Sequence, residues 1–242
     1  MRKKKFQVVL VLAILLFTGC QTTNPNIVKY DNPITISGYT ETTNLDNFTA
    51  IINERSTAII EKYNPLFNRQ VSVILFPSAE ALHKAQGRET APDWMVGSAM
   101  PNGEIWMVNP YCSSVHDYES MKKILVHEYT HVVVMSVNSR IPSWLNEGIA
   151  CYEADQKIDQ KTATYVKQQA EEEQLPNFWE IDKDRSTGDV YIYAGIIIEY
   201  ILEQYSLESL NAFIRTPDIL KIFDKSWQEF QDGWKKYIIE KY

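Results

Sequence analysis

The chain has 242 residues, enough for one ordinary domain or two small ones, and its hydrophobic fraction of 45% excludes an intrinsically disordered protein. Its formal net charge is -7, and without the four basic residues of the first nineteen positions it is 20 minus 31, or -11. A charge of this size argues against nucleic acid and against anionic lipid as partners, because both are themselves negatively charged. The sequence contains no internal repeat, so the simplest interpretation is a single monomeric domain from residue 31 to 242.

The first nineteen residues have the layout of a secretory signal peptide. Basic residues from Arg2 to Lys5 precede an apolar run from Phe6 to Phe17 that a single glutamine interrupts. A membrane-spanning helix is the alternative, but it needs about 20 apolar residues, more than this run supplies. We therefore expect a signal peptide over residues 1–19 and a protein that acts outside the cytoplasm.

The segment from Leu16 to Cys20 resembles a bacterial lipobox, in which the signal is cut before a cysteine that then receives a lipid. Phe17 departs from the leucine expected three residues before that cysteine. The resemblance implies that the mature chain begins at Cys20 and that a lipid on this residue anchors the protein to the bacterial cell membrane. Residues 20–30 would then form a short spacer.

The first half of the domain is predicted to combine helices with a small sheet. Apolar residues recur at helical spacing from Asn44 to Tyr63, and a second, short helix is expected from Ala79 to Ala85. Between them, Gln70 to Phe76 alternates and is rich in valine and isoleucine, as is typical of a strand. A turn at Pro101–Gly103 precedes a second expected strand, Glu104 to Val108, and we expect both strands to share one sheet.

The second half is predicted to be helical. The segment from Tyr118 to Val137 has a broad apolar face, and Pro142 suits the start of a helix that continues from Trp144 to Ala154. A buried helix is expected from Asp189 to Tyr205, although the isoleucines between Val190 and Ile198 leave a strand as the alternative. The other expected helical segments are Gln156–Gln174, Leu207–Ile214 and Ile219–Tyr242.

The strongest motif lies within the long helix predicted from Tyr118 to Val137. His127 and His131 are four positions apart, so on a helix they share one face and are separated by one turn. Two imidazole nitrogens placed in this way can bind one ion, and a catalytic zinc takes three protein ligands and leaves the fourth position to water. Glu128 can take the proton of that water as general base. Only about 0.005 such matches are expected by chance in a chain of this composition, so the sequence predicts one zinc ion per chain.

The third ligand is predicted to be Glu147, 16 positions after His131 in the apolar segment Trp144 to Ala150. A loop between antiparallel helices would bring this residue back beside the histidines. The alternative, a solvated glutamate, does not require neighbours that are so apolar. A closed structural site with four protein ligands fits less well, because the remaining histidines, His83 and His116, lack partner cysteines at suitable spacing. We assign neither of these two histidines a role.

These motifs resemble those of the gluzincins, zinc peptidases of the peptidase MA family, which carry His-Glu-x-x-His on one helix and Trp-Leu-x-Glu-Gly-x-Ala on the next. The resemblance runs from about residue 71 to 215. It implies a zincin-like α+β fold with a small mixed sheet, an edge strand over the cleft and a helical C-terminal half. It also implies hydrolysis of a peptide or protein substrate by zinc-bound water, with Glu104 to Val108 as the edge strand that pairs with the substrate.

Two further expectations follow from the resemblance. In related enzymes a tyrosine beyond the third ligand donates to the oxyanion of the reaction intermediate, and here Tyr193 is the first candidate and Tyr191 the second. Some gluzincins have an aspartate four residues after the glutamate ligand, where it orients a ligand histidine, but this chain has Cys151 at that position. Glu153 or Asp155 is then the expected substitute.

The sequence thus predicts a zinc-dependent peptidase, either an endopeptidase or an aminopeptidase. The alternative is a membrane-anchored protein of the same fold that binds zinc or assists assembly without catalysis, and the intact Glu128 argues against it. Whether Cys112 and Cys151 form a disulfide is left open, because an extracytoplasmic location permits one and buried free thiols fit equally well.

Overall fold

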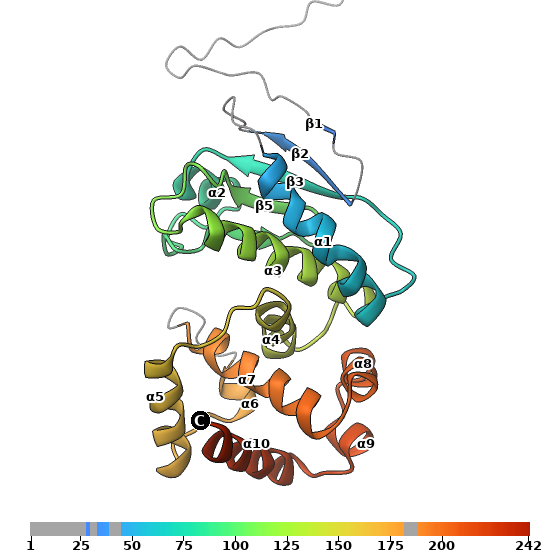
Figure 1. Ribbon diagram of the computed structural model, residues 1–242, viewed down its shortest axis with the longest axis vertical. Coiled ribbons are helices and arrows are strands. Elements are labelled where there is room, and N and C mark those ends of the chain that lie inside the picture. Colours follow the sequence, from blue (N-terminus) through green and yellow to red (C-terminus); the bar gives the residue numbers. More distant parts are fainter. Residues whose placement is uncertain (1–27, 30–32, 39–44, 182–187) are drawn as a thin grey trace, which may run out of the picture.

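The computed structural model describes residues 28–29, 33–38, 45–181 and 188–242, so the predicted signal peptide and lipobox lie outside the described residues. Figure 1 shows two halves stacked along the long axis, a sheet with helices in one half and a group of helices in the other. No helix among the described residues is long and apolar enough to cross a membrane. The elements in chain order are β1 (Val28–Lys29), β2 (Ile34–Gly38), α1 (Asp46–Tyr63), β3 (Val71–Phe76), α2 (Ala79–Ala85), β4 (Gly97–Ala99), β5 (Ile105–Val108), α3 (Tyr118–Val137), α4 (Ser143–Glu153), α5 (Gln160–Glu171), α6 (Phe178–Ile181), α7 (Asp189–Gln204), α8 (Leu207–Arg215), α9 (Ile219–Phe223) and α10 (Trp227–Lys241).

The sheet is mixed, with its strands in the order β1-β2-β3-β5-β4. Strands β2, β3 and β5 are parallel, and the outer strands β1 and β4 run antiparallel to their neighbours. In β3 the side chains of Val71, Val73 and Leu75 are buried and alternate with half-buried residues, as the sequence pattern predicts. Helices α1 and α3 lie side by side next to the sheet (Figure 1), and α3 contacts β4 and β5. The predicted combination of a small mixed sheet with a largely helical chain is therefore confirmed.

The edge of the sheet differs from the expectation. The segment Glu104–Val108 corresponds to β5, which lies between β3 and β4, so its prediction as the edge strand is wrong. The edge on this side is β4, Gly97–Ala99, which was not predicted from the sequence. Glycine, serine and alanine have no preference for strands, and three residues are too few to show an alternation.

The expected helices are present, with adjusted ends in several places. Helix α3 has the predicted bounds, and the carboxylate of Asp117 caps it by accepting a hydrogen bond from the amide of Ser120 at 2.7 Å. The apolar segment of α7 is a helix and not the alternative strand. The predicted segment Gln156–Gln174 narrows to α5, which Asp159 caps. The segment Ile219–Tyr242 divides into α9 and α10, because a left-handed residue and a capping box interrupt it.

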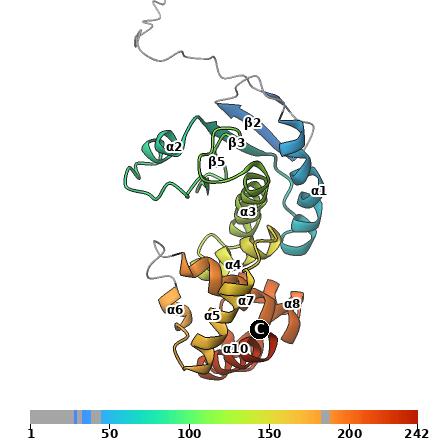
Figure 2. The ribbon, with the colours of Figure 1, turned by 60° about the vertical axis from the view of Figure 1, so that its left-hand side comes forward.

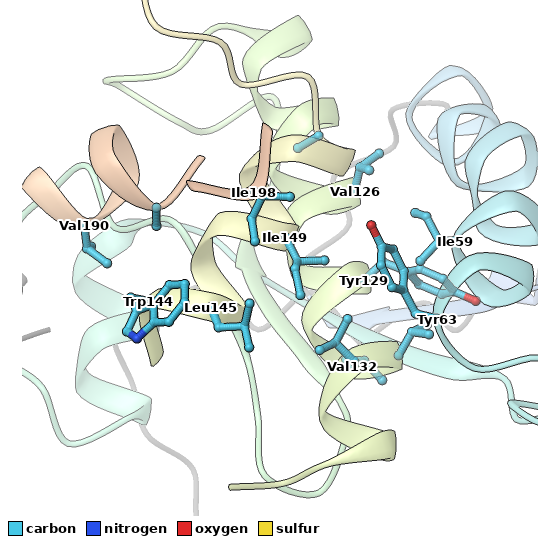
Figure 3. Packing of buried hydrophobic residues seen from close by; sticks show 14 of the residues in the cluster. Ile59, Tyr63, Val126, Tyr129, Val132, Trp144, Leu145, Ile149, Val190 and Ile198 are labelled. Carbon is cyan, nitrogen blue, oxygen red and sulfur yellow. The ribbon is translucent and has the colours of Figure 1, made fainter. Parts of the chain in front are cut away.

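Helix α4 connects the two halves of the molecule, and in Figure 2 it lies between α3 above and α5, α7, α8 and α10 below. Figure 3 shows Tyr129 of α3 beside Tyr63 of α1, and Ile149 of α4 beside Ile198 of α7. All four side chains are buried. Burying one large apolar side chain contributes about 1.5–3 kcal/mol. This packing joins α3 to α1 and α4 to α7, and α3 and α4, the helices that carry the predicted metal ligands, also contact each other.

Candidate metal centre

Two histidines of α3 form the first part of the candidate site. The Nε2 atoms of His127 and His131 are 3.0 Å apart, and the planes of the two rings are perpendicular. Both histidines are buried, and each residue is only 6% exposed. The spacing of four residues on a regular helix produces this arrangement, because it places the rings one turn apart on the same face.

Glu147 of α4 supplies the third group. Its Oε2 atom lies 3.2 Å from Nε2 of His127 and 3.4 Å from Nε2 of His131. The carboxylate is buried, and burial alone would raise its pKa. The charges and hydrogen bonds of the two histidines outweigh burial and hold the pKa of Glu147 well below its ordinary value. The carboxylate is therefore ionised at neutral pH, as a metal ligand must be.

The separations of the three donor atoms fit a single metal ion. Ligand atoms bound to one zinc ion at 2.0–2.1 Å with tetrahedral angles lie about 3.3 Å from one another. The three separations found here are 3.0, 3.2 and 3.4 Å. A cation shared between the two imidazole nitrogens and the carboxylate would compensate for the burial of these polar atoms.

Glu128, the predicted base, follows His127 on α3 and is 7% exposed. Its side chain extends toward Gly97 of β4. A Cβ atom at position 97 would lie 3.1 Å from Oε1 and from Cγ of Glu128. Gly97 therefore provides the space that this carboxylate occupies between α3 and the edge strand.

A cleft runs along β4 and past these residues. It consists of two adjoining cavities with volumes of about 260 and 380 Å³, both lined by Met95, Gly97, His127, Glu128 and Tyr191. The smaller cavity also has the apolar side chains of Trp94 and Ile124 in its wall. The larger one extends along the edge strand to His131 and Glu147. The cluster of donor atoms is thus open to a space that can hold a second molecule.

The two candidate tyrosines of α7 lie in different surroundings. Tyr191 lines the cleft, and its ring centroid is 6.2 Å from that of His127 and 5.8 Å from that of Trp94. Tyr193 is 5% exposed, and its ring makes an edge contact with that of Trp234 in the core. The second candidate from the sequence, Tyr191, is therefore the one that the structure brings to the metal ligands.

Neither of the two carboxylates that were expected to orient a ligand histidine does so, and His127 instead interacts with Gln156 and with the side chain of Cys151. Nδ1 of His127 forms a hydrogen bond of 3.0 Å with Oε1 of Gln156. Glu153 instead accepts hydrogen bonds from Tyr63 and Lys62, and Asp155 forms surface ion pairs with lysines. Gln156 was not among the residues predicted from the sequence, because no motif places it near His127.

The two other histidines support the wall of the cleft. His83 is buried, and its Nε2 donates to the carbonyl oxygen of Met95 at 2.7 Å. His116 lines the smaller cavity, and its Nε2 donates to the carbonyl oxygen of Trp94 at 2.9 Å. Both therefore fix the segment that leads into β4, and neither belongs to the group of residues that could hold a metal ion.

Whether Cys112 and Cys151 form a disulfide was left open from the sequence, and in the described part of the chain these two cysteines are not bonded to each other. Cys151 is buried and contributes to the wall of the smaller cavity. It therefore lies near His127, on the helix that also provides Glu147.

The described residues contain a buried group of two histidines and one glutamate that could hold a metal ion. Sites with three protein ligands leave a coordination position for water or for a substrate. No protein-family model matches the chain, and a search of curated proteins found no match.

Proposed function

We propose that this chain is a zinc-dependent peptidase that hydrolyses peptide bonds outside the cytoplasm. The observation that carries the proposal is the convergence of three buried donor groups in a cleft whose wall also contains the carboxylate of Glu128. Two imidazoles and one carboxylate are a ligand set of catalytic zinc sites, with the ion held by His127, His131 and Glu147. When bound, zinc supplies an acidified water molecule and a Lewis acid that polarises a carbonyl group.

The protein groups around the ligands have roles that follow from their positions. Glu128 accepts a proton from the attacking water and passes it to the leaving amine, as a general base and then a general acid. The hydroxyl group of Tyr191 donates a hydrogen bond to the oxygen that becomes negatively charged in the transition state. Its place in the wall of the cleft supports this assignment over Tyr193.

The cleft suggests how a peptide is held. Strand β4 is the outermost strand of the sheet on the side of the cleft, and it has a pairing partner on only one side among the described residues. An extended peptide can add to such an edge through main-chain hydrogen bonds. The smaller cavity, with Trp94, Ile124 and Tyr191 in its wall, then receives a large apolar side chain of the substrate.

The proposed location rests on the sequence of residues 1–20. A lipid on Cys20 would hold the enzyme at the outer face of the bacterial cell membrane. Replacing Cys20 by alanine should release the protein from the membrane fraction into the soluble fraction. Retention of Cys20→Ala in the membrane fraction would point to an uncleaved membrane segment instead.

Cleavage of a mixed peptide library tests the proposed activity. Glu128→Gln keeps the shape of the side chain but cannot accept the proton, so turnover should fall by at least about 100-fold. Zinc content should stay near one ion per chain, because Glu128 is not a ligand. Glu119→Gln, a matched change at an exposed position of the same helix, should leave turnover unchanged.

The library experiment also separates the peptidase from its alternative. A wild-type chain that binds zinc but cleaves no member of the library would support a non-catalytic zinc-binding or assembly protein. Equal turnover by wild type and Glu128→Gln would contradict the proposed mechanism.

A further inference from the structure

The hydrogen bond between His127 and Gln156 determines which nitrogen of the imidazole faces the donor cluster. Oε1 of Gln156 is a carbonyl oxygen and can only accept, so Nδ1 of His127 carries the proton of this 3.0 Å contact. In the neutral ring Nε2 is then unprotonated. Its lone pair points toward His131 and Glu147, where a metal ion would bind.

The end of α4 places Gln156 in this position. Helix α4 ends at Glu153, and Asp155 has a left-handed conformation with φ of 51°. The amide of Gln156 donates to the carbonyl of Cys151 at 3.0 Å, and that of Asp155 donates to the carbonyl of Tyr152 at 3.2 Å. This pattern is a Schellman motif, which reverses the chain at the end of a helix. The side chain of Gln156 is thereby directed back toward α3.

Both nitrogens of the His127 ring are therefore contacted by residues of α4 and of the turn that ends it. Glu147, near the beginning of α4, lies 3.2 Å from Nε2, and Gln156, just beyond its end, lies 3.0 Å from Nδ1. The other ligand histidine lacks such support, because Nδ1 of His131 is buried without a hydrogen-bond partner in the described part of the chain. Of these two histidines, only His127 has a hydrogen bond at Nδ1 that holds its ring, among the described residues.

We propose that Gln156 is the positioning residue of the metal centre, which holds His127 in the tautomer and ring orientation that bind the ion. This inference rests on the metal site of the proposed function but not on the proposed reaction. A hydrogen-bond acceptor on the far nitrogen of a ligand histidine typically contributes 10–100-fold to metal affinity, so about this factor is expected here.

The uncharged amide has a further consequence for the site. A carboxylate in the same place would make the imidazole more basic and strengthen its bond to the metal. Gln156 orients the ring without this added negative charge. We therefore expect zinc to bind less tightly to the wild type than to a variant with a carboxylate at this position.

Zinc affinity of the full chain, measured by competition with a chromophoric chelator in the absence of substrate, tests the proposal. Gln156→Met has a side chain of similar size without an acceptor and should weaken zinc binding by about 10–100-fold. Gln156→Glu should bind zinc at least as tightly as the wild type. Gln160→Ala, a change at an exposed glutamine nearby, should leave the affinity unchanged.

A second readout distinguishes positioning from a general loss of structure. Nitrogen NMR of the zinc-loaded wild type should show the proton of His127 on Nδ1, protected from exchange with solvent, and Gln156→Met should lose this protection while its melting temperature stays near that of the wild type. Unchanged zinc affinity in Gln156→Met would overturn the proposal. A wild type that binds zinc but cleaves no peptide would contradict only the proposed function, whereas a wild type that binds no zinc would contradict both.

Discussion

Gly148 of α4 lies against the backbone of Ala194 in α7, so closely that a Cβ atom at position 148 would come within 2.4 Å of the Ala194 carbonyl oxygen. The contact joins the residue next to the ligand Glu147 with the helix that carries Tyr191. The glycine in the Trp-Leu-x-Glu-Gly segment thus has a packing role, because it lets α4 and α7 approach each other.

Replacing Gly148 by alanine should push α7 away from α4. The atom that blocks the new methyl group belongs to the backbone and cannot rotate aside, so we expect a loss of about 1–3 kcal/mol in the free energy of unfolding. Zinc affinity should fall as well, because Glu147 is displaced. Gly195→Ala is the matched control, since its Cβ would meet no atom closer than 3.8 Å. Chemical denaturation of both variants checks this prediction, which fails if Gly148→Ala is as stable as Gly195→Ala.

The buried carboxylate of Glu153 ties the end of α4 to α1, and the hydroxyl of Tyr63 donates to it at 2.7 Å. Tyr63→Phe removes this hydrogen bond to a charged group and should lower the free energy of unfolding by about 1.5–3 kcal/mol. Tyr165→Phe, at a position that is 51% exposed, should change it by less than about 0.5 kcal/mol. Equal stability of the two variants in urea denaturation would show that the bond contributes nothing.

The same tyrosine predicts a dependence of stability on pH. Burial, together with the nearby charge of Glu153, raises the pKa of Tyr63 well above its ordinary value. The folded state therefore holds the phenol proton more tightly than the unfolded state does. This contribution is complete below the unfolded pKa of about 10 and is lost as the pH rises through the folded pKa. Wild-type stability should consequently fall more steeply above pH ~10 than that of Tyr63→Phe.

Gly97 determines the space available to the proposed base. A Cβ at this position would lie 2.9 Å from Cγ2 of Ile124 and 3.1 Å from Oε1 of Glu128. Gly97→Val should displace the carboxylate and lower kcat/KM by about 100-fold, since misplacement by about 1 Å is enough for such a loss. Zinc affinity should be retained, because the atoms nearest to the new side chain belong to Ile124 and Glu128 and not to a predicted ligand. Full activity in the valine variant would mean that Glu128 does not act from the position seen here.

The choice between the two tyrosines can be made by paired substitutions. Removing one donor to the developing oxyanion typically lowers kcat by about 100–1,000-fold, and this is expected of Tyr191→Phe. Tyr193→Phe should have little effect on kcat, because the Tyr193 ring packs in the core against Trp234. Steady-state kinetics on one cleaved peptide distinguish them, and a large loss in Tyr193→Phe alone would reverse the assignment.

The parts of the site that depend on spacing within one element could be predicted from the sequence. The bounds of α3 follow from its broad apolar face, and the four-residue spacing then brings His127 and His131 together. Glu147 was predicted because its apolar neighbours indicated a buried helix, although its distance from the histidines depends on the packing of α4 on α3.

The remaining parts depend on tertiary structure. Helix α7 is apolar around most of its circumference, so the sequence could not tell which side faces the cleft, and Tyr193 was preferred to Tyr191. Gln156 reaches His127 because Asp155 adopts a left-handed conformation. An aspartate in the sequence does not by itself predict this conformation. Strand β4 is defined by its pairing with β5 and not by its own residues.

The most direct test of the account is the zinc affinity of the wild type and of Glu147→Ala, measured under the same conditions with chelator competition. We predict one tightly bound zinc ion per wild-type chain and the loss of tight binding in the variant, because only two of the three ligands remain. Glu171→Ala, at an exposed position of α5, should bind zinc as the wild type does. Zinc affinity that is the same in Glu147→Ala and in the wild type would contradict the assignment of the metal centre.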